Sequence, residues 1–165
     1  MTSNNDRAPP TRRSDFPYWT PVATRWHDND IYGHVNNVVY YSYFDTLVNA
    51  HAIAQGAFDL HAGPVIGLVV ESGCRYHAPL TFPEAIDAGL RVARLGRSSV
   101  TYRIGLFSAG SDSAAADGHF THVMVDRATR RPVDPADGCG VSAANRSCAI
   151  ARARATSSSS NFVSE

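Results

Sequence analysis

The chain is arranged around residues 25–37, which read Arg25-Trp-His-Asp-Asn-Asp-Ile-Tyr-Gly-His-Val-Asn-Asn37. An extended apolar lead-in, residues 18–26, runs into the closely spaced carboxylates Asp28 and Asp30. Gly33 gives the backbone room to turn, and Asn36-Asn37 stand where a long aromatic helix should begin, because Asn is a favoured N-cap residue. Backbone N–H groups at a helix start can hold an oxyanion, and a nearby Asp can attack a carbonyl or activate water. The stretch therefore suits chemistry on a carbonyl group.

On either side of this stretch the pattern predicts a strand and a helix. Residues 16–25 indicate an edge strand, since Pro21 is tolerated at a sheet edge and not in a central strand. Residues 37–55 carry apolar side chains at close to helical spacing, and Gly56 follows as a stop. Because Val38, Val39 and the Tyr residues are poor helix formers, burial must hold this helix, and we expect a sheet wrapped around it.

Four more strands are predicted, at 65–77, 85–95, 98–107 and 115–126, because apolar and polar residues alternate along each. In the first of them the alternation places one set of side chains on a single face: Ile66, Leu68, Val70, Cys74 and Tyr76. Short connections imply hairpins and an antiparallel sheet. The order of one strand, one long helix and four strands is α+β and fits a single domain over residues 17–135.

The two ends of the chain differ from this domain in composition. Residues 1–16 are polar and contain Pro9-Pro10, which predicts a disordered leader. Residues 136–165 are rich in Ala, Ser and Arg and predict a poorly ordered tail. The leader lacks the apolar core of a signal peptide, and no apolar run is long enough to span a bilayer. A cytoplasmic protein with no membrane association is the resulting expectation.

Charge and cysteine content exclude several classes of function. The 15 basic and 15 acidic residues balance, so nothing in the charge favours nucleic acid or a membrane surface as a partner. The three Cys residues have no metal spacing and do not indicate a disulfide framework. A list of potential metal ligands, His27, Asp28, Asp30 and His34, matches no zinc signature, so no metal is expected.

The run from Asp28 to Tyr40 resembles the 4-hydroxybenzoyl-CoA thioesterase-like branch of the hotdog-fold acyl-CoA thioesterases. Phe82-Pro83, the turn at 96–99 and the segment 125–132 extend the resemblance, which covers roughly residues 18–134. It implies a hotdog fold, with a five-stranded antiparallel sheet around one long central helix. It also implies hydrolysis of an acyl-CoA to a free acid and CoA, with no cofactor beyond the coenzyme A of the substrate. Members of the family tend to finish near the segment matching Arg131-Pro132, so the tail departs from the pattern.

By this resemblance Asp30 lies beside the thioester carbonyl, as nucleophile or as general base for water, and Asp28 is structural. The alternative is a purely structural role, in which both carboxylates only accept hydrogen bonds from backbone amides of the turn. The backbone N–H of Asn37 is implied to face the thioester oxygen, while Asn36 caps the helix. His34 either orients water or is a turn histidine bonded to backbone.

The remaining implied site residues bind the substrate. Gly33 and Asn36 shape the substrate side of the turn, and Arg97, Ser98 and Ser99 form a turn that could meet the phosphates of CoA, or could be a polar hairpin tip. Hotdog domains typically assemble as homodimers or homotetramers with the active site at a subunit interface. Candidates to line such a pocket are Glu71, Ser72, Gly73 and His77, although Glu71 reads better as an exposed strand position.

Two rivals to the thioesterase hypothesis remain open at this point. One keeps the fold but acts as an enoyl-thioester hydratase or dehydratase, since those enzymes also pair Asp and His near the helix start. The other is a non-catalytic module that binds acyl-CoA. The acyl group is equally open, because small residues and Tyr around the expected pocket fit an aromatic or a short to medium aliphatic chain.

Overall fold

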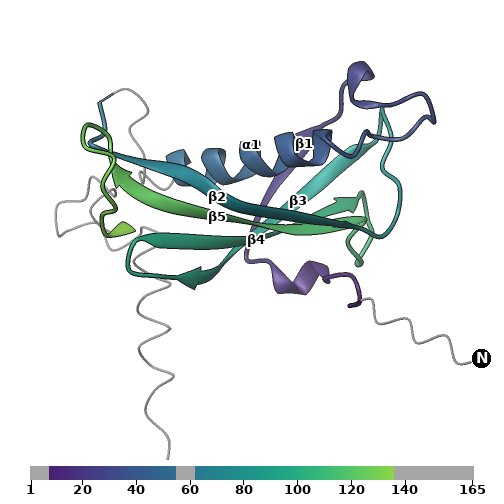
Figure 1. Ribbon diagram of the computed structural model, residues 1–165. Helices are drawn as coiled ribbons and strands as arrows, with labels where there is room; N and C mark the ends of the chain where they lie inside the picture. The colour runs from purple at the N-terminus through teal and green to yellow at the C-terminus, as the bar shows by residue number, and fades with distance from the viewer. Residues whose placement is uncertain (1–7, 55–61, 136–165) are drawn as a thin grey trace, which may run out of the picture.

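In the computed structural model, residues 8–54 and 62–135 are described, and they form one long helix against a single sheet (Figure 1). The elements in chain order are η1 (Arg13–Asp15), β1 (Tyr18–Ala23), η2 (Trp26–Asp28), α1 (Val39–Ala54), β2 (Val65–Tyr76), β3 (Ala85–Leu95), β4 (Ser99–Ser108) and β5 (Ala116–Asp126). The predicted α+β hotdog fold is confirmed, with each element within two residues of its expected range where the chain is described. The predicted tail, 136–165, lies outside the described residues.

The sheet is antiparallel, and its strands run in the order β1-β3-β4-β5-β2. β3, β4 and β5 follow one another as hairpins, whereas β2 pairs with β5 and becomes one edge of the sheet. β1 is the other edge, so Pro21, opposite Asp87, costs no hydrogen bond in the interior of the sheet. The edge position expected for this strand is therefore confirmed.

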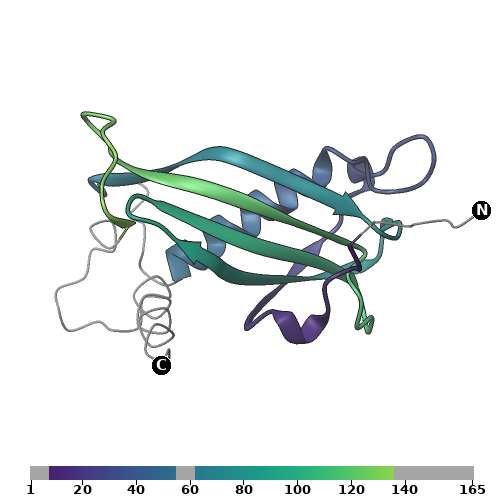
Figure 2. The ribbon, with the colours of Figure 1, turned by 60° about the horizontal axis from the view of Figure 1, so that its bottom comes forward.

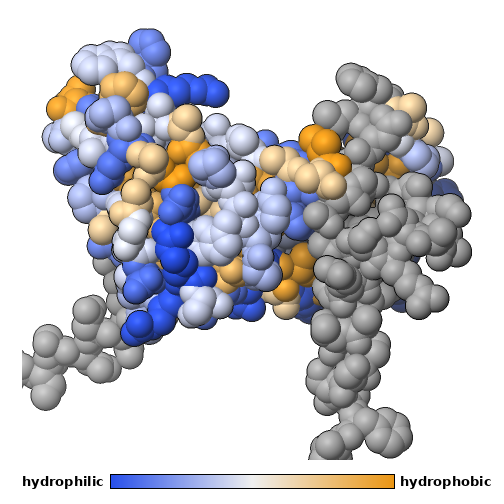
Figure 3. Space-filling model, turned by 180° about the vertical axis from the view of Figure 1, so that it is seen from behind, coloured by the Kyte–Doolittle hydropathy of each residue, from blue (hydrophilic) through white to orange (hydrophobic). Residues whose placement is uncertain are grey.

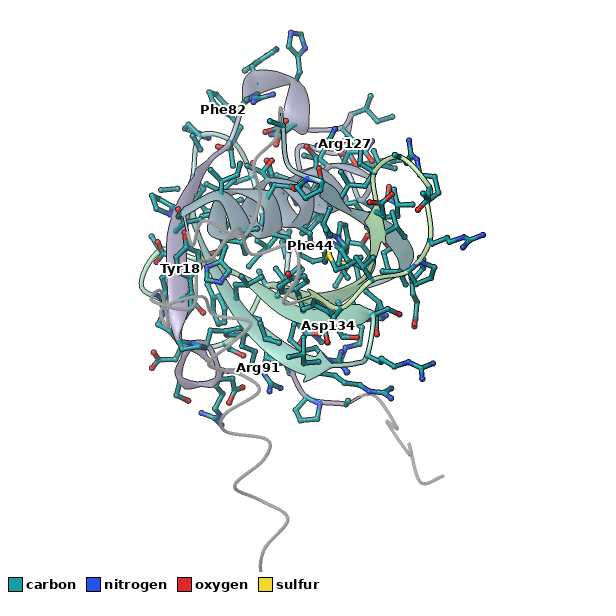
Figure 4. The ribbon with its side chains drawn as sticks, turned by 90° about the vertical axis from the view of Figure 1, so that its left-hand side faces the viewer. Tyr18, Phe44, Phe82, Arg91, Arg127 and Asp134 are labelled. Atoms are coloured by element: carbon teal, nitrogen blue, oxygen red, sulfur yellow. The ribbon has the colours of Figure 1, made fainter. Side chains whose placement is uncertain are left out.

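The helix α1 lies across one face of the sheet, which curves around it (Figures 1 and 4). Phe44, Leu47 and Val48 are fully buried, and Figure 4 shows Phe44 between helix and sheet. Burying such a side chain stabilises the fold by about 1.5–3 kcal/mol. A poor helix former costs only ~0.7 kcal/mol or less, so packing outweighs the weak helix propensity of this segment. No helix in the described part of the chain is long and apolar enough to cross a membrane.

The face pattern predicted for β2 is correct only in its second half. Cys74 and Tyr76 pack against the core, but Leu68 and Val70 are exposed at 39% and 60%, and Val65 is the buried residue near the start of the strand. The pairing with β5 shifts between Val69 and Glu71, which marks a β-bulge. One extra residue moves every preceding side chain to the opposite face, and alternation in the sequence cannot reveal where that residue is inserted.

The predicted disordered leader is wrong for residues 8–16, while residues 1–7 lie outside the described chain. Phe16 is buried in a second cluster with Trp19, Phe107 and Ala114 on the face of the sheet opposite α1. The guanidinium of Arg13 lies 4.6 Å from the centroid of the Trp19 ring and 2.7 Å from Oδ2 of Asp87. The polar composition of the leader did not predict this small core, because Phe16 packs against residues that lie outside the leader.

Candidate active site

The loop between β1 and α1 is fixed at its start by the buried carboxylate of Asp28. Its Oδ2 accepts hydrogen bonds from the backbone N–H of Arg25 and the hydroxyl of Tyr43, each 2.6 Å away. Only 8% of Asp28 is exposed. The first bond closes η2 and the second joins the loop to α1, so Asp28 has the structural role expected for it.

Asp30 begins a tight turn in the same loop. Its backbone N–H donates to the carbonyl of His34 at 2.8 Å, and its own carbonyl accepts from Gly33 at 3.1 Å. Gly33 has φ of +82°, a conformation that side chains disfavour, which is why glycine stands here. Oδ1 of Asp30 accepts the backbone N–H of Tyr32 at 2.8 Å. The turn-capping alternative thus holds for Oδ1, while Oδ2 has no hydrogen bond among the described residues.

The half-buried carboxylate of Asp30 lies near the first turn of α1. Burial raises the pKa of the Tyr40 hydroxyl, and the charge on Asp30 adds to that rise. An electrostatic effect of this kind requires the two groups to be close, since charges separated by solvent are strongly screened. The charge of Asp30 thus acts on Tyr40, in the first turn of α1.

Asn29, between the two Asp residues, anchors the turn to the segment before β3. Its Nδ2 donates to the carbonyl of Gly33 at 3.3 Å and to Oγ1 of Thr81 at 3.2 Å, and its Oδ1 accepts the N–H of Phe82 at 3.0 Å. Figure 4 shows Phe82 beside this loop. Sequence reasoning gave Asn29 and Thr81 no role, because the two residues are 52 positions apart in the chain.

The predicted Asn pair lies in the turn that leads into α1. The side chain of Asn36 accepts the N–H of Val38 at 3.2 Å, so Asn36 caps the turn before α1 and not, as expected, the helix itself, which begins at Val39. The carbonyl of Asn37 accepts the hydroxyl of Tyr76 at 3.0 Å. No hydrogen bond among the described residues uses the N–H of Asn37. Tyr76 is a further positioning residue that the sequence did not single out.

The remaining predicted site residues in this region are His34, Glu71 and His77. The imidazole of His34 is exposed and makes no hydrogen bond with the described residues, although its carbonyl closes the Asp30 turn. Glu71 is exposed, as favoured, and lies 3.1 Å from Nε2 of His119, whereas His77 lies 3.2 Å from Oδ2 of Asp117. In the described ranges, no group of three or more His, Cys, Asp or Glu side chains could hold a metal ion.

The turn carrying Arg97, Ser98 and Ser99 lies at the opposite end of the sheet from the Asp30 loop (Figure 1). Ser99 is five residues from Ile104 along β4, which is roughly 17 Å. Ile104 pairs with Gly118, over which Phe44 near the start of α1 packs. One chain by itself therefore does not bring this turn to Asp30.

Apolar side chains are exposed around the carboxylate. The exposed fractions are 76% for Trp26, 92% for Ile31 and 78% for Tyr32. Figure 3 shows hydrophobic side chains on the projection formed by this loop, at upper left. Large exposed apolar residues gathered on one loop are typical of a surface that a ligand or a partner covers.

Comparison with known proteins places the chain in a family. The model of the thioesterase superfamily matches residues 32–115, just over half of the chain. The PA5185 protein of Pseudomonas aeruginosa is 52% identical over 79% of this chain and 94% of its own, with a TM-score of 0.75. A Xanthomonas campestris protein, provisionally named an acyl-CoA thioesterase, is 30% identical over 68% of this chain and 95% of its own, with a TM-score of 0.59. No curated protein gave a match.

A more distant structure shares the fold. DHNA-CoA thioesterase from Staphylococcus aureus is 17% identical, covers 88% of this chain and 95% of its own, and has a TM-score of 0.70. The chain belongs to the thioesterase superfamily. It is a thioester hydrolase of the hotdog fold, as the resemblance implied.

Proposed function

We propose that the protein is an acyl-CoA thioesterase and that Asp30 attacks the thioester or activates the water that does so. The observation that carries the proposal is that the loop leading into α1 contains two groups that the fold itself does not use. Asp30 holds its turn with Oδ1 and leaves Oδ2 without a hydrogen bond among the described residues, and the N–H of Asn37 is unused there. A base or nucleophile beside an oxyanion donor is what acyl transfer needs.

In the nucleophilic route, Oδ2 of Asp30 bonds to the thioester carbonyl carbon and the C–S bond breaks. CoA leaves as a thiolate, and water then cleaves the mixed anhydride. In the general-base route, Asp30 takes a proton from water, hydroxide adds to the carbonyl carbon, and the thiolate leaves and takes up a proton. In both routes the N–H of Asn37 stabilises the oxyanion, and no metal or cofactor takes part.

The proposal includes a homodimer that completes the site. In the part of the chain that the structure describes, β2 is an edge strand with no further neighbour, and it exposes Leu68, Val69 and Val70. Two such edges paired antiparallel about a two-fold axis would bring the Val65 end of one chain to the Tyr76 end of the other. Ser99 lies near the first end, and Asn37 lies at the second. The turn at 96–98 would then come from the partner subunit toward the nucleotide of the substrate.

The direct test is Asp30→Asn, assayed by release of CoA with a thiol reagent across a panel of acyl-CoA thioesters. The Asn side chain can still accept the N–H of Tyr32, so the turn is kept, and turnover should fall by about a hundredfold or more. Asp45→Asn removes an exposed carboxylate from α1 and should leave turnover unchanged. Near-normal turnover of Asp30→Asn would falsify the assignment.

A labelling experiment separates the two routes. In single turnover in ¹⁸O water, hydrolysis of an anhydride at the Asp30 carbonyl carbon puts the label into the Asp30 peptide, which mass spectrometry detects. Because attack of water on the acyl carbon of an anhydride also labels only the released acid, a second experiment quenches the single turnover with hydroxylamine. An Asp30 hydroxamate together with an acyl hydroxamate indicates the anhydride, and the absence of both with an unlabelled Asp30 indicates the general-base route.

A further inference from the structure

A hollow lies on the face of the sheet that α1 does not cover. It has a volume of about 510 Å³, and its lining includes Arg91, Arg103, His119 and Gly73. Figure 2 shows this face, which the N-terminal segment crosses at one end, and Figure 4 shows Arg91 on the side of the sheet away from α1. Phe44 packs on the α1 side of the same region, over Gly118. The hollow is therefore separated from the Asp30 loop by the sheet.

The register explains why the basic side chains gather there. Arg91 on β3 is directly opposite Arg103 on β4, Arg103 is opposite His119 on β5, and His119 is opposite Gly73 on β2. Residues in one row across neighbouring strands point to the same face. Gly73 keeps this row open, because a Cβ there would lie 2.6 Å from Cε1 of His119.

The charges in this row are unbalanced. Arg75, which also lines the hollow, is paired with Oδ1 of Asp117 at 2.8 Å, and the other oxygen of Asp117 accepts the N–H of Thr11 at 2.9 Å. Arg91 and Arg103 have no ion pair among the described residues. Like charges directly opposite each other on adjacent strands repel and destabilise the sheet. Arg91 and Arg103 therefore bring two guanidinium groups to the hollow with no acidic partner among the described residues, while Glu71 pairs with His119 at 3.1 Å.

We propose that this hollow binds a small phosphorylated anion, of the pyrophosphate or nucleotide class, separately from the thioester site. Guanidinium groups bind phosphate oxygens in a fork, so two of them facing each other suit a group with several anionic oxygens. The volume lies within the range of small-molecule sites. A second copy of the chain is disfavoured as occupant, because it would bring four like charges together.

The test uses the full chain without acyl-CoA and measures binding of pyrophosphate and of ADP by titration calorimetry. Wild type should bind at least one of them saturably, and Arg103→Gln or Arg91→Gln should weaken this binding by about tenfold or more. Arg94→Gln is the matched control, since Arg94 is an exposed arginine on β3 outside the hollow. No binding to wild type, or equal weakening by the control, overturns the proposal.

Thermal unfolding without ligand gives a readout independent of binding. Removing one of two facing like charges should raise the melting temperature of Arg103→Gln by about 2 °C, with no change in Arg94→Gln. A lower melting temperature in both Arg91→Gln and Arg103→Gln would show that these residues stabilise the sheet. That result would contradict the inferred repulsion between the two arginines and overturn the proposal.

Acyl-CoA kinetics test the separation of the two sites. KM for acyl-CoA should be the same in Arg103→Gln and wild type. A rise in KM that parallels the loss of pyrophosphate binding would overturn the separation and place the hollow within the substrate site. Because the binding titrations contain no thioester, their outcome stands whether or not the proposed thioesterase mechanism is correct.

Discussion

The hydroxyl of Tyr43 in α1 donates a 2.6 Å hydrogen bond to Oδ2 of Asp28, a carboxylate with only 8% exposure. This bond ties α1, which directly follows the candidate oxyanion donor Asn37, to the loop that carries Asp30. Burial raises the pKa of Tyr43, and the bond to Asp28 adds to that rise, so the hydroxyl stays protonated and remains a donor at neutral pH.

Tyr43→Phe should therefore weaken both the fold and the reaction. A hydrogen bond to a charged group contributes about 1.5–3 kcal/mol to stability, and a misplacement of about an ångström can cost a hundredfold in rate. Urea unfolding and kcat for an acyl-CoA give the two effects. Tyr41→Phe is the control, because the Tyr41 ring packs beside Phe120 and its hydroxyl makes no hydrogen bond among the described residues. Equal effects of the two substitutions would refute the coupling between helix and loop.

Gly33→Ala and Gly110→Ala form a second matched pair. The two glycines have φ of +82° and +77°, and a Cβ at either would meet nothing within 4 Å. Each alanine should lower the free energy of unfolding by about 1–2 kcal/mol through backbone strain alone. Only Gly33→Ala should also reduce kcat, since Gly33 closes the turn of Asp30. If both variants keep full turnover, the geometry of that turn is not limiting.

Because His122 is buried, we expect the protein to lose stability in mild acid. His122 is 3% exposed, and neither ring nitrogen has a hydrogen-bond partner within residues 8–54 and 62–135. Burial lowers its pKa below the ordinary 6.5, and the charge of Asp45 opposes that shift only in part. The unfolded chain thus takes up the proton first. The neutral ring makes its full contribution to the free energy of unfolding above about pH 6.5. This contribution is lost as the pH falls toward the lower pKa of the folded state.

Urea midpoints at pH 7.5 and 5.5 measure this effect. His122→Phe should narrow the difference between the two midpoints, whereas His34→Gln, which changes an exposed histidine, should leave it as in wild type. His51 is also buried with a lowered pKa and should account for part of the remaining difference. An unchanged difference in His122→Phe would contradict the prediction.

Val70→Lys tests the proposed dimer. Val70 is 60% exposed on β2, at the bulge in the free edge of the sheet. A lysine there should block edge pairing, giving a monomer in light scattering after gel filtration and a large loss of turnover. Ile53→Lys places the same charge on α1 at a residue that is 44% exposed, and it should leave the assembly intact. A wild-type chain that is monomeric and fully active would exclude the composite site.

Local patterns in the sequence determined the elements of this protein. The alternation of apolar residues on β3 and β4, the apolar spacing along α1 and Pro21 at an edge strand all predicted what is observed. The Asp-x-Asp run, Gly33 and the Asn pair also predicted a turn leading into a helix. These features depend on neighbours within a few residues, so a single sequence is enough to read them.

Tertiary structure decided what holds the candidate site and what lies behind it. Some contacts join positions that are far apart in the chain, such as the hydrogen bonds from Asn29 to Thr81 and from Tyr76 to Asn37. Others join neighbouring strands, such as the register pair of Arg91 and Arg103. Which residues meet in this way depends on strand order and register, and a bulge such as that at Val70 shifts the register by one residue without any local signal. Local propensity fixes the elements, but packing between distant segments fixes their neighbours, and the candidate chemistry depends on those neighbours.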